Sequence, residues 1–168
     1  MMTTTLNGKS TQEIEIAKVE KLLKEIADEQ CWGARLSVGN ELRLEFGTKL
    51  PNLNLRGKQK GVWRLGTGTS HWAITMADEH VVDSYRESLL VEEIIKLLDG
   101  KRVKEFKIDW SSLNAKVLFN AGIRLDLFPN LKRRSRLHHW ELFMPDSMLL
   151  RIGPSQTWSL VSSKEIVQ

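Results

Sequence analysis

The chain has 168 residues, of which 41% are hydrophobic and 27% are charged, and this ordinary globular composition excludes an intrinsically disordered chain. Its formal net charge of +4 is too small for a protein that coats nucleic acid along its whole surface. The single cysteine, Cys31, excludes an internal disulfide and a cysteine-rich zinc site, and it is typical of a reducing compartment.

The N-terminal segment MMTTTLNGKSTQE has no apolar core, and no apolar run approaches the roughly 20 residues that a membrane helix needs. We therefore expect a flexible N-terminus over residues 1–10, no signal peptide, and a soluble cytoplasmic protein without a membrane partner. The rest of the chain is long enough to bury a substantial core.

The first expected element is a helix that begins near residue 11. Ser10 or Thr11 can cap it, and Glu13 or Glu15 then lies in its first turn, where a negative charge is favourable. The apolar residues that recur at helical spacing are Ile16, Val19, Leu22, Leu23 and Ile26.

Alternating apolar residues follow over 32–38 and 42–46, with Arg35, Arg43 and Glu45 on the opposite face. The turn signal VGNE between the two runs predicts a hairpin. Two strands that carry tryptophans are expected around 61–66 and 71–77.

The second half begins with a helix over about 85–98, closed by Asp99 and Gly100. Short strands joined by tight turns come next, which favours antiparallel pairing. These strands are centred on Ile108, Val117, Leu125, Trp140–Leu142, Leu150–Ile152 and Trp158–Leu160.

The two halves resemble each other, because VEKLLKEI and VEEIIKLL are followed in the same order by a phenylalanine and two tryptophans. We interpret this as a duplication, with a first α+β repeat over 11–77 and a second over 84–163 in one compact domain. The predicted fold class is α+β: two units, each a helix followed by an antiparallel meander, related by a pseudo-twofold, with each helix packed on a sheet. This alignment makes Trp63 the counterpart of Trp140.

Both units place cations just before the strand of the matched tryptophan. If the two loops lie near each other, they form one surface for phosphates or for a carboxylate-rich partner. The alternative is that polar hairpin loops carry Lys and Arg for solubility and to discourage edge pairing. The candidate anion-binding or partner-binding residues are Arg56, Lys58, Lys60, Lys132, Arg133, Arg134, Arg136 and His139.

Strand alternation separates the two adjacent histidines: with Trp140 facing inward, His138 also faces inward and His139 faces outward. No third ligand is at hand, so we expect no metal site here and no cofactor. Cys31 is expected to be a buried structural thiol.

Two further segments are read as connections. The segment MADEHVVDSY, residues 76–85, is expected to be a polar linker between the repeats. The segment RLGTGTSHW, residues 64–72, lacks the Lys–Ser/Thr ending of a phosphate loop and is expected to be a hairpin loop.

The segment GIRLDLFP…HHWELFMPDSMLLRIGP…TW resembles uncharacterised bacterial families of the toxin-immunity type over about residues 122–160. The motif residues of this resemblance are Trp140, Glu141, Leu142, Pro145, Asp146, Gly153, Pro154 and Trp158. Ser155 stands where these families have a second glycine. The resemblance implies a small cytosolic binding protein without chemistry of its own.

Three hypotheses of function follow from the sequence. The first is a non-catalytic module that binds a protein partner, with a homodimer as an open alternative. The second is a nucleic-acid or anion binder that uses the basic loops 56–60 and 132–136. The third is a hydrolase-type enzyme with His71, His80 or His138 in a cleft between the halves.

Overall fold

The computed structural model describes residues 5–6, 8–52, 57–85, 88–132 and 136–165. Within these residues the fold is α+β, with two α-helices, two large antiparallel sheets and a small two-stranded ribbon. The class predicted from the sequence is therefore confirmed.

The first half begins with the ribbon and a helix whose last turn tightens into a 3₁₀ turn. Ser10 caps this helix by accepting a hydrogen bond from the Glu13 amide (3.2 Å), and Glu13 accepts one from the Ser10 amide (3.1 Å), which confirms the predicted helix start. The elements are β1 (Thr5–Leu6), β2 (Lys9–Ser10), α1 (Thr11–Leu23), η1 (Lys24–Ile26), β3 (Cys31–Leu36), η2 (Val38–Asn40), β4 (Leu42–Pro51), β5 (Gln59–Gly66), β6 (His71–Met76) and β7 (Glu79–Asp83).

The second half repeats the sequence of a helix, a 3₁₀ turn and a series of strands. Its elements are α2 (Ser88–Ile95), η3 (Lys96–Leu98), β8 (Val103–Ile108), β9 (Ala115–Phe119), η4 (Asn120–Gly122), β10 (Ile123–Phe128), β11 (Trp140–Met144), η5 (Pro145–Ser147), β12 (Met148–Ile152), β13 (Trp158–Ser162) and η6 (Ser163–Glu165). All the strands predicted for this half are present.

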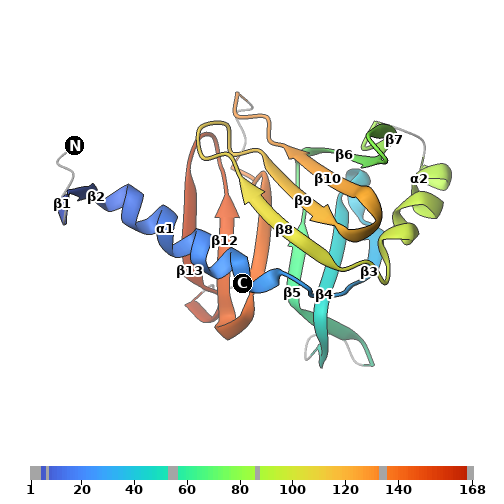
Figure 1. The fold of residues 1–168 in the computed structure, drawn as a ribbon, viewed down its shortest axis with the longest axis horizontal. Coiled ribbons are helices and arrows are strands. Elements are labelled where there is room, and N and C mark those ends of the chain that lie inside the picture. The colour runs from blue at the N-terminus through green and yellow to red at the C-terminus, as the bar shows by residue number, and fades with distance from the viewer. Residues whose placement is uncertain (1–4, 7, 53–56, 86–87, 133–135, 166–168) are drawn as a thin grey trace.

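Each large sheet is built from strands of both halves. The six-stranded sheet has the order β13-β12-β11-β5-β4-β3, and the five-stranded sheet has the order β7-β6-β10-β9-β8. The first half thus contributes β3, β4 and β5 to the six-stranded sheet and β6 and β7 to the five-stranded one, whereas the second half contributes β8, β9 and β10 to the five-stranded sheet and β11, β12 and β13 to the six-stranded one (Figure 1). The expectation that each half forms a meander of its own is wrong.

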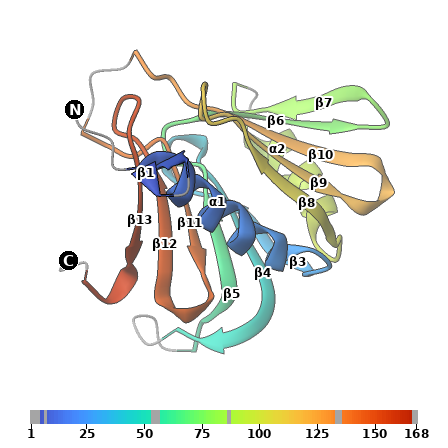
Figure 2. The same cartoon turned by 60° about the vertical axis from the view of Figure 1, so that its left-hand side comes forward.

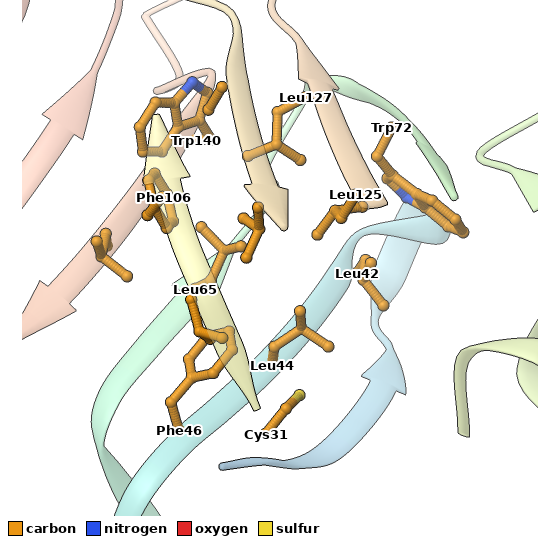
Figure 3. Close-up of a cluster of buried hydrophobic side chains, with 14 of the residues drawn as sticks. Cys31, Leu42, Leu44, Phe46, Leu65, Trp72, Phe106, Leu125, Leu127 and Trp140 are labelled. Carbon is orange, nitrogen blue, oxygen red and sulfur yellow. The ribbon is translucent and has the colours of Figure 1, made fainter. Parts of the chain in front are cut away.

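The core lies between the two sheets (Figure 3). Leu44, Leu65 and Leu142 face it from adjacent strands of the six-stranded sheet, and Leu125 faces it from β10. The rings of Phe46 and Phe119 stack with centroids 6.4 Å apart, which ties β4 of one sheet to β9 of the other. Burial of these apolar surfaces is the main stabilising contribution to the fold.

The two halves cross where the segments after the 3₁₀ turns meet. Residues 28–31 and 100–103 pair as an antiparallel crossing centred on the bridge between Gln30 and Arg102. Its hydrogen bonds run from Asp28 N to Val103 O (2.8 Å), from Gly100 N to Cys31 O (2.7 Å), from Val103 N to Glu29 O (2.9 Å) and from Cys31 N to Lys101 O (2.8 Å).

The helices lie at the edges of the sheets. α1 contacts β8, the edge strand of the five-stranded sheet, and α2 contacts both β3 and β7. Figure 2 shows α1 running across the opening between the two sheets. Neither α-helix in the described part of the chain has the length and apolar content to cross a bilayer.

Three sequence predictions are corrected by the strand order. Counted from the edge strands β3 and β8, β5 takes the place of β10 and β11 the place of β6, so Trp63 on β5 and Trp140 on β11 do not occupy equivalent positions. The expected linker over 76–85 contains the strand β7, whose Val82 is fully buried although the segment is mostly polar. The segment 64–72, expected to be a hairpin loop, instead crosses from one sheet to the other between β5 and β6, with Thr67 and Ser70 buried.

Substitution of Trp140 tests the packing of the core between the two sheets. This tryptophan is fully buried, its ring lies 5.9 Å from that of Phe106, and its indole donates to Leu113 O (3.1 Å). We expect Trp140→Ala to lower the free energy of unfolding by about 3–5 kcal/mol in chemical denaturation. Val38→Ala, at a site that is 93% exposed, should change it by less than about 0.5 kcal/mol, and equal effects of the two changes would contradict the described core.

Candidate functional site

The outer face of the six-stranded sheet carries two rows of side chains that run across its strands. Cross-strand pairing fixes the rows, because directly opposed residues of an antiparallel pair share a face. The first row comprises Arg35, Arg43, Gly66, Glu141 and Arg151. The second row comprises Glu45, Arg64, Phe143 and Leu149.

Gly66 leaves a hollow in the middle of the first row. A side-chain carbon at this position would lie 3.0 Å from Glu41 Oε1 and 3.9 Å from Glu141 Cγ. The hollow has a volume of about 230 Å³, and Arg43 and Arg64 are among its walls. Glycine thus opens a space between side chains of opposite charge.

Two further hollows extend this space along β5 and β11. One, of about 370 Å³, shares Glu41, Arg43 and Glu141 with the hollow at Gly66. The other, of about 260 Å³, shares Arg64 and Phe143 with it. We call the three together the outer-face groove.

Most of the charged side chains in the outer-face groove are paired. Arg35 lies 3.4 Å from Glu45, Arg43 lies 3.3 Å from Glu41, and Arg151 lies 3.3 Å from Glu141. These pairs are partly exposed, so each contributes little to stability. Their effect is to fix the direction of the arginine side chains.

Arg64 differs from these arginines. Its guanidinium lies 4.3 Å from the centroid of the Phe143 ring, a cation–π geometry. Among the described residues Arg64 forms no ion pair. Arg64 therefore offers a cation, held in place by an aromatic ring, at the junction of two hollows.

Glu45 is the buried carboxylate of this face. Its side chain is 4% exposed and accepts a hydrogen bond from the Gly61 amide (3.0 Å) in addition to its contact with Arg35. A buried charge without such partners would be costly. Glu45 thus holds the start of β5 in position beneath the groove.

The two adjacent histidines are placed opposite to the sequence prediction. His139 is 1% exposed, and His138 is half-buried in the outer-face groove. β11 begins only at Trp140 and the chain bends at His139, so strand alternation does not extend to these residues. His139 packs against Gly153, where a side-chain carbon would lie 2.7 Å from its ring, and its Nε2 donates to Ser155 O (2.9 Å).

The described parts of the two basic loops lie at opposite ends of β5. Lys58 and Lys60 stand at its start, whereas Arg136 precedes β11, whose first residues pair with the end of β5. The separation along the strand is about 20 Å at roughly 3.3 Å per residue, so these described parts do not converge. Of the other predicted cations, Lys132 is exposed. Arg56, Arg133 and Arg134 lie outside the described residues.

The outer-face groove is lined by one residue of the first basic loop and by the residues that directly follow the second. Lys60 lines its hollow at the start of β5, and Leu137 and His138 line the hollow at the other end. Lys60 is thus the one described candidate binding residue that lines the groove. The sequence prediction missed the middle of the groove, formed by Arg64, Gly66 and Phe143, because only the pairing of β5 with β11 brings these residues together.

The histidines considered for catalysis do not share a cleft. His71 Nδ1 lies 2.5 Å from the Ser84 hydroxyl, and Ser84 also accepts a hydrogen bond from the Trp72 amide. His80 pairs with Asp83 at 2.9 Å. His71 is covered by Tyr85, whose ring stacks on it at 4.2 Å, so this cluster fastens the end of β7 to β6.

Neither metal binding nor thiol chemistry is indicated by the described side chains. Within the described ranges no group of three or more His, Cys, Asp or Glu side chains is arranged to hold a metal ion. Burial, with the nearby Asp99 and Glu45 charges, raises the pKa of the Cys31 thiol far above its usual range, as expected for a structural cysteine.

Comparison with protein families, with curated proteins and with solved structures finds no match to this chain. The function must therefore be argued from the geometry of the site.

His138 provides a titration test of the outer-face groove. Burial, and then the nearby Arg151 charge, lower the pKa of His138 from its usual 6.5. We expect its NMR titration to fall below 6.5, and Arg151→Gln to raise this pKa while Lys116→Gln, on the other sheet, does not. A His138 pKa that is insensitive to Arg151→Gln would contradict the described contact.

The lowered pKa of His138 also makes the stability of the fold depend on pH. Burial also lowers the pKa of His71, so the folded chain favours the neutral form of both histidines. Their contribution to stability is complete above their usual pKa of 6.5 and is lost as the pH falls towards the lower folded values.

Proposed function

We propose that this chain is a non-catalytic protein-binding module whose partner lies along the outer-face groove. The observation that carries this proposal is Arg64, a cation without an ion-pair partner among the described residues, stacked on Phe143 where two hollows meet. Arginine next to an aromatic ring is a frequent combination at the energetic centre of protein interfaces.

The mixed charge of the groove favours a protein over a nucleic acid. Glu41, Glu45 and Glu141 line it together with its arginines, and a chain of phosphates would meet these carboxylates at close range. A polypeptide can instead place acidic side chains against Arg64 and basic ones against the glutamates. The partner surface that meets Arg64 is therefore acidic in this proposal.

In this proposal the groove binds a partner and performs no reaction. Its three glutamates are engaged by arginines or by a backbone amide, so they are fixed as charge partners. General acid or base catalysis requires a group that is free to exchange its proton with a substrate. The resemblance of residues 122–160 to immunity-type families agrees with this proposal and suggests a cytosolic setting.

We also infer that the two halves derive from a duplication and are related by a pseudo-twofold. The support is the recurrence of registers: β3 pairs with β4 at Leu36↔Leu42, and β8 pairs with β9 at Ile108↔Ala115. In the crossing, the bond from Asp28 to Val103 has its equivalent in the bond from Gly100 to Cys31. In this alignment the counterpart of Trp140 is Trp72, at the start of HWAITM and HWELFM.

Charge reversal at the centre of the groove tests the proposed binding function. We expect Arg64→Glu to abolish capture of the partner from a lysate of the source cells, and to weaken the purified complex at least about tenfold, or about 1.4 kcal/mol. Gly66→Val should have a similar effect because it fills the hollow without a change of charge. Binding can be measured by calorimetry.

Lys116→Glu is the matched control, since Lys116 is exposed on β9 of the other sheet. It should retain the partner. A protein captured equally by Arg64→Glu and by the unaltered chain would refute the assignment of the groove. Capture that disappears after nuclease treatment, with a steep dependence on salt, would favour nucleic acid.

A further inference from the structure

A second groove lies between α1 and β8, on the opposite sheet from the outer-face groove. It has a volume of about 480 Å³, with Leu23, Lys24 and Ala27 on the helical side and residues 104–108 on the strand side. We call it the β8 groove. Figure 1 shows α1 and β8 close together near the crossing and farther apart towards the end of β8.

Backbone amides of β8 point into this space. Asp109 donates to Asn114 O (2.9 Å), and Lys107 pairs with Lys116 two residues earlier, so both Asp109 and Lys107 bond towards β9. Alternation in an antiparallel ladder then directs the amides of Phe106 and Ile108 to the other side. In the described chain no acceptor is found there for the Phe106 amide.

β3, the edge strand of the six-stranded sheet, shows which group can accept a hydrogen bond from an outward-pointing edge amide. On β3 the amide of Ala34 also points away from the sheet, and it donates to the Asp99 carboxylate at 2.9 Å. Asp99 follows η3 just as Ala27 follows η1, and their backbones agree (φ −61°, ψ 128° and φ −57°, ψ 138°). The edge of β3 therefore has a carboxylate that accepts a hydrogen bond from its Ala34 amide, whereas the equivalent position beside β8 carries only the methyl group of Ala27.

The charges around the β8 groove are favourable for an acidic ligand. Lys107 pairs with Glu105 at 3.4 Å, and Glu20 accepts a hydrogen bond from the Trp110 indole (3.0 Å). Lys24 and Lys104 have no ion pair within the described residues. Two cations thus flank a strand edge with a free amide.

We propose that the β8 groove binds an extended acidic segment of a partner protein. The segment adds to the edge of β8 through the Ile108 amide, and one of its carboxylates accepts a hydrogen bond from the Phe106 amide, as Asp99 does from Ala34 on β3. Strand addition at a free edge gains affinity from backbone hydrogen bonds, and its specificity comes from side-chain pockets. Lys24 and Lys104 select for acidic side chains.

The probe is a fluorescent peptide in which valine alternates with glutamate. We expect it to bind the full chain in fluorescence anisotropy and to shift the NMR signals of the Phe106 and Ile108 amides. The same peptide with lysine in place of glutamate should bind at least about tenfold more weakly. An equal affinity for the two peptides, or no binding of either, would overturn the proposal.

Ala27→Asp is the decisive variant, because it supplies an internal carboxylate where β3 has Asp99. We expect it to weaken peptide binding at least about tenfold, and to slow hydrogen exchange of the Phe106 amide by forming a new hydrogen bond. Ala27 is exposed, so the fold should be retained. Ala17→Asp, the same change at an exposed position of α1 outside the groove, should bind as the unaltered chain does.

Two further outcomes would locate the ligand elsewhere. Loss of peptide binding in Arg64→Glu would place the peptide in the outer-face groove and overturn this assignment, whereas unchanged binding supports it. A dimer of the unaltered chain in sedimentation that Ala27→Asp converts to a monomer would identify a second copy of β8 as the occupant, and would also overturn it.

Discussion

The fold depends on the backbone crossing between residues 28–31 and 100–103. Four hydrogen bonds of 2.7–2.9 Å join these segments around the bridge of Gln30 with Arg102. Immediately before the crossing each chain segment finishes a helix, and immediately after it each begins an edge strand. The crossing thus positions β3 and β8, and with them the two three-stranded parts from which the sheets are built. Since both halves supply strands to both sheets, neither half can bury its apolar residues alone.

Both candidate binding surfaces result from this exchange of strands. The outer-face groove is centred on the contact of Arg64 with Phe143, and these residues belong to different halves. The β8 groove is likewise formed by α1 of the first half and β8 of the second. Each binding surface further depends on one residue of the first half. Gly66 opens a hollow in one, and Ala27, in the place that corresponds to Asp99, leaves a strand edge without its carboxylate in the other.

Local sequence signals predicted the elements well, because they depend on neighbours in the chain. The capping box of Ser10 and Glu13, the alternation over β4 and the strands of the second half are present. The alternation expected over 32–38 is not, because a bulge between Trp32 and Arg35 interrupts β3 and Val38, beyond its end, is 93% exposed. The errors arose where tertiary structure decides. His139 is buried because Gly153 makes room for it, and β7 forms because β6 pairs with it. Trp63 was matched to Trp140 because similarity of short motifs cannot show that a chain changes sheets between β5 and β6.

The most direct test of this account is hydrogen exchange of the crossing amides, followed by NMR in the native state. If the crossing holds the two halves together, the amides of Asp28, Cys31, Gly100 and Val103 exchange only through global unfolding. Their exchange free energies then equal the free energy of unfolding from chemical denaturation. Exchange of these four amides by local opening, with the cores of both sheets still protected, would show that the halves are held together elsewhere and would contradict the central claim.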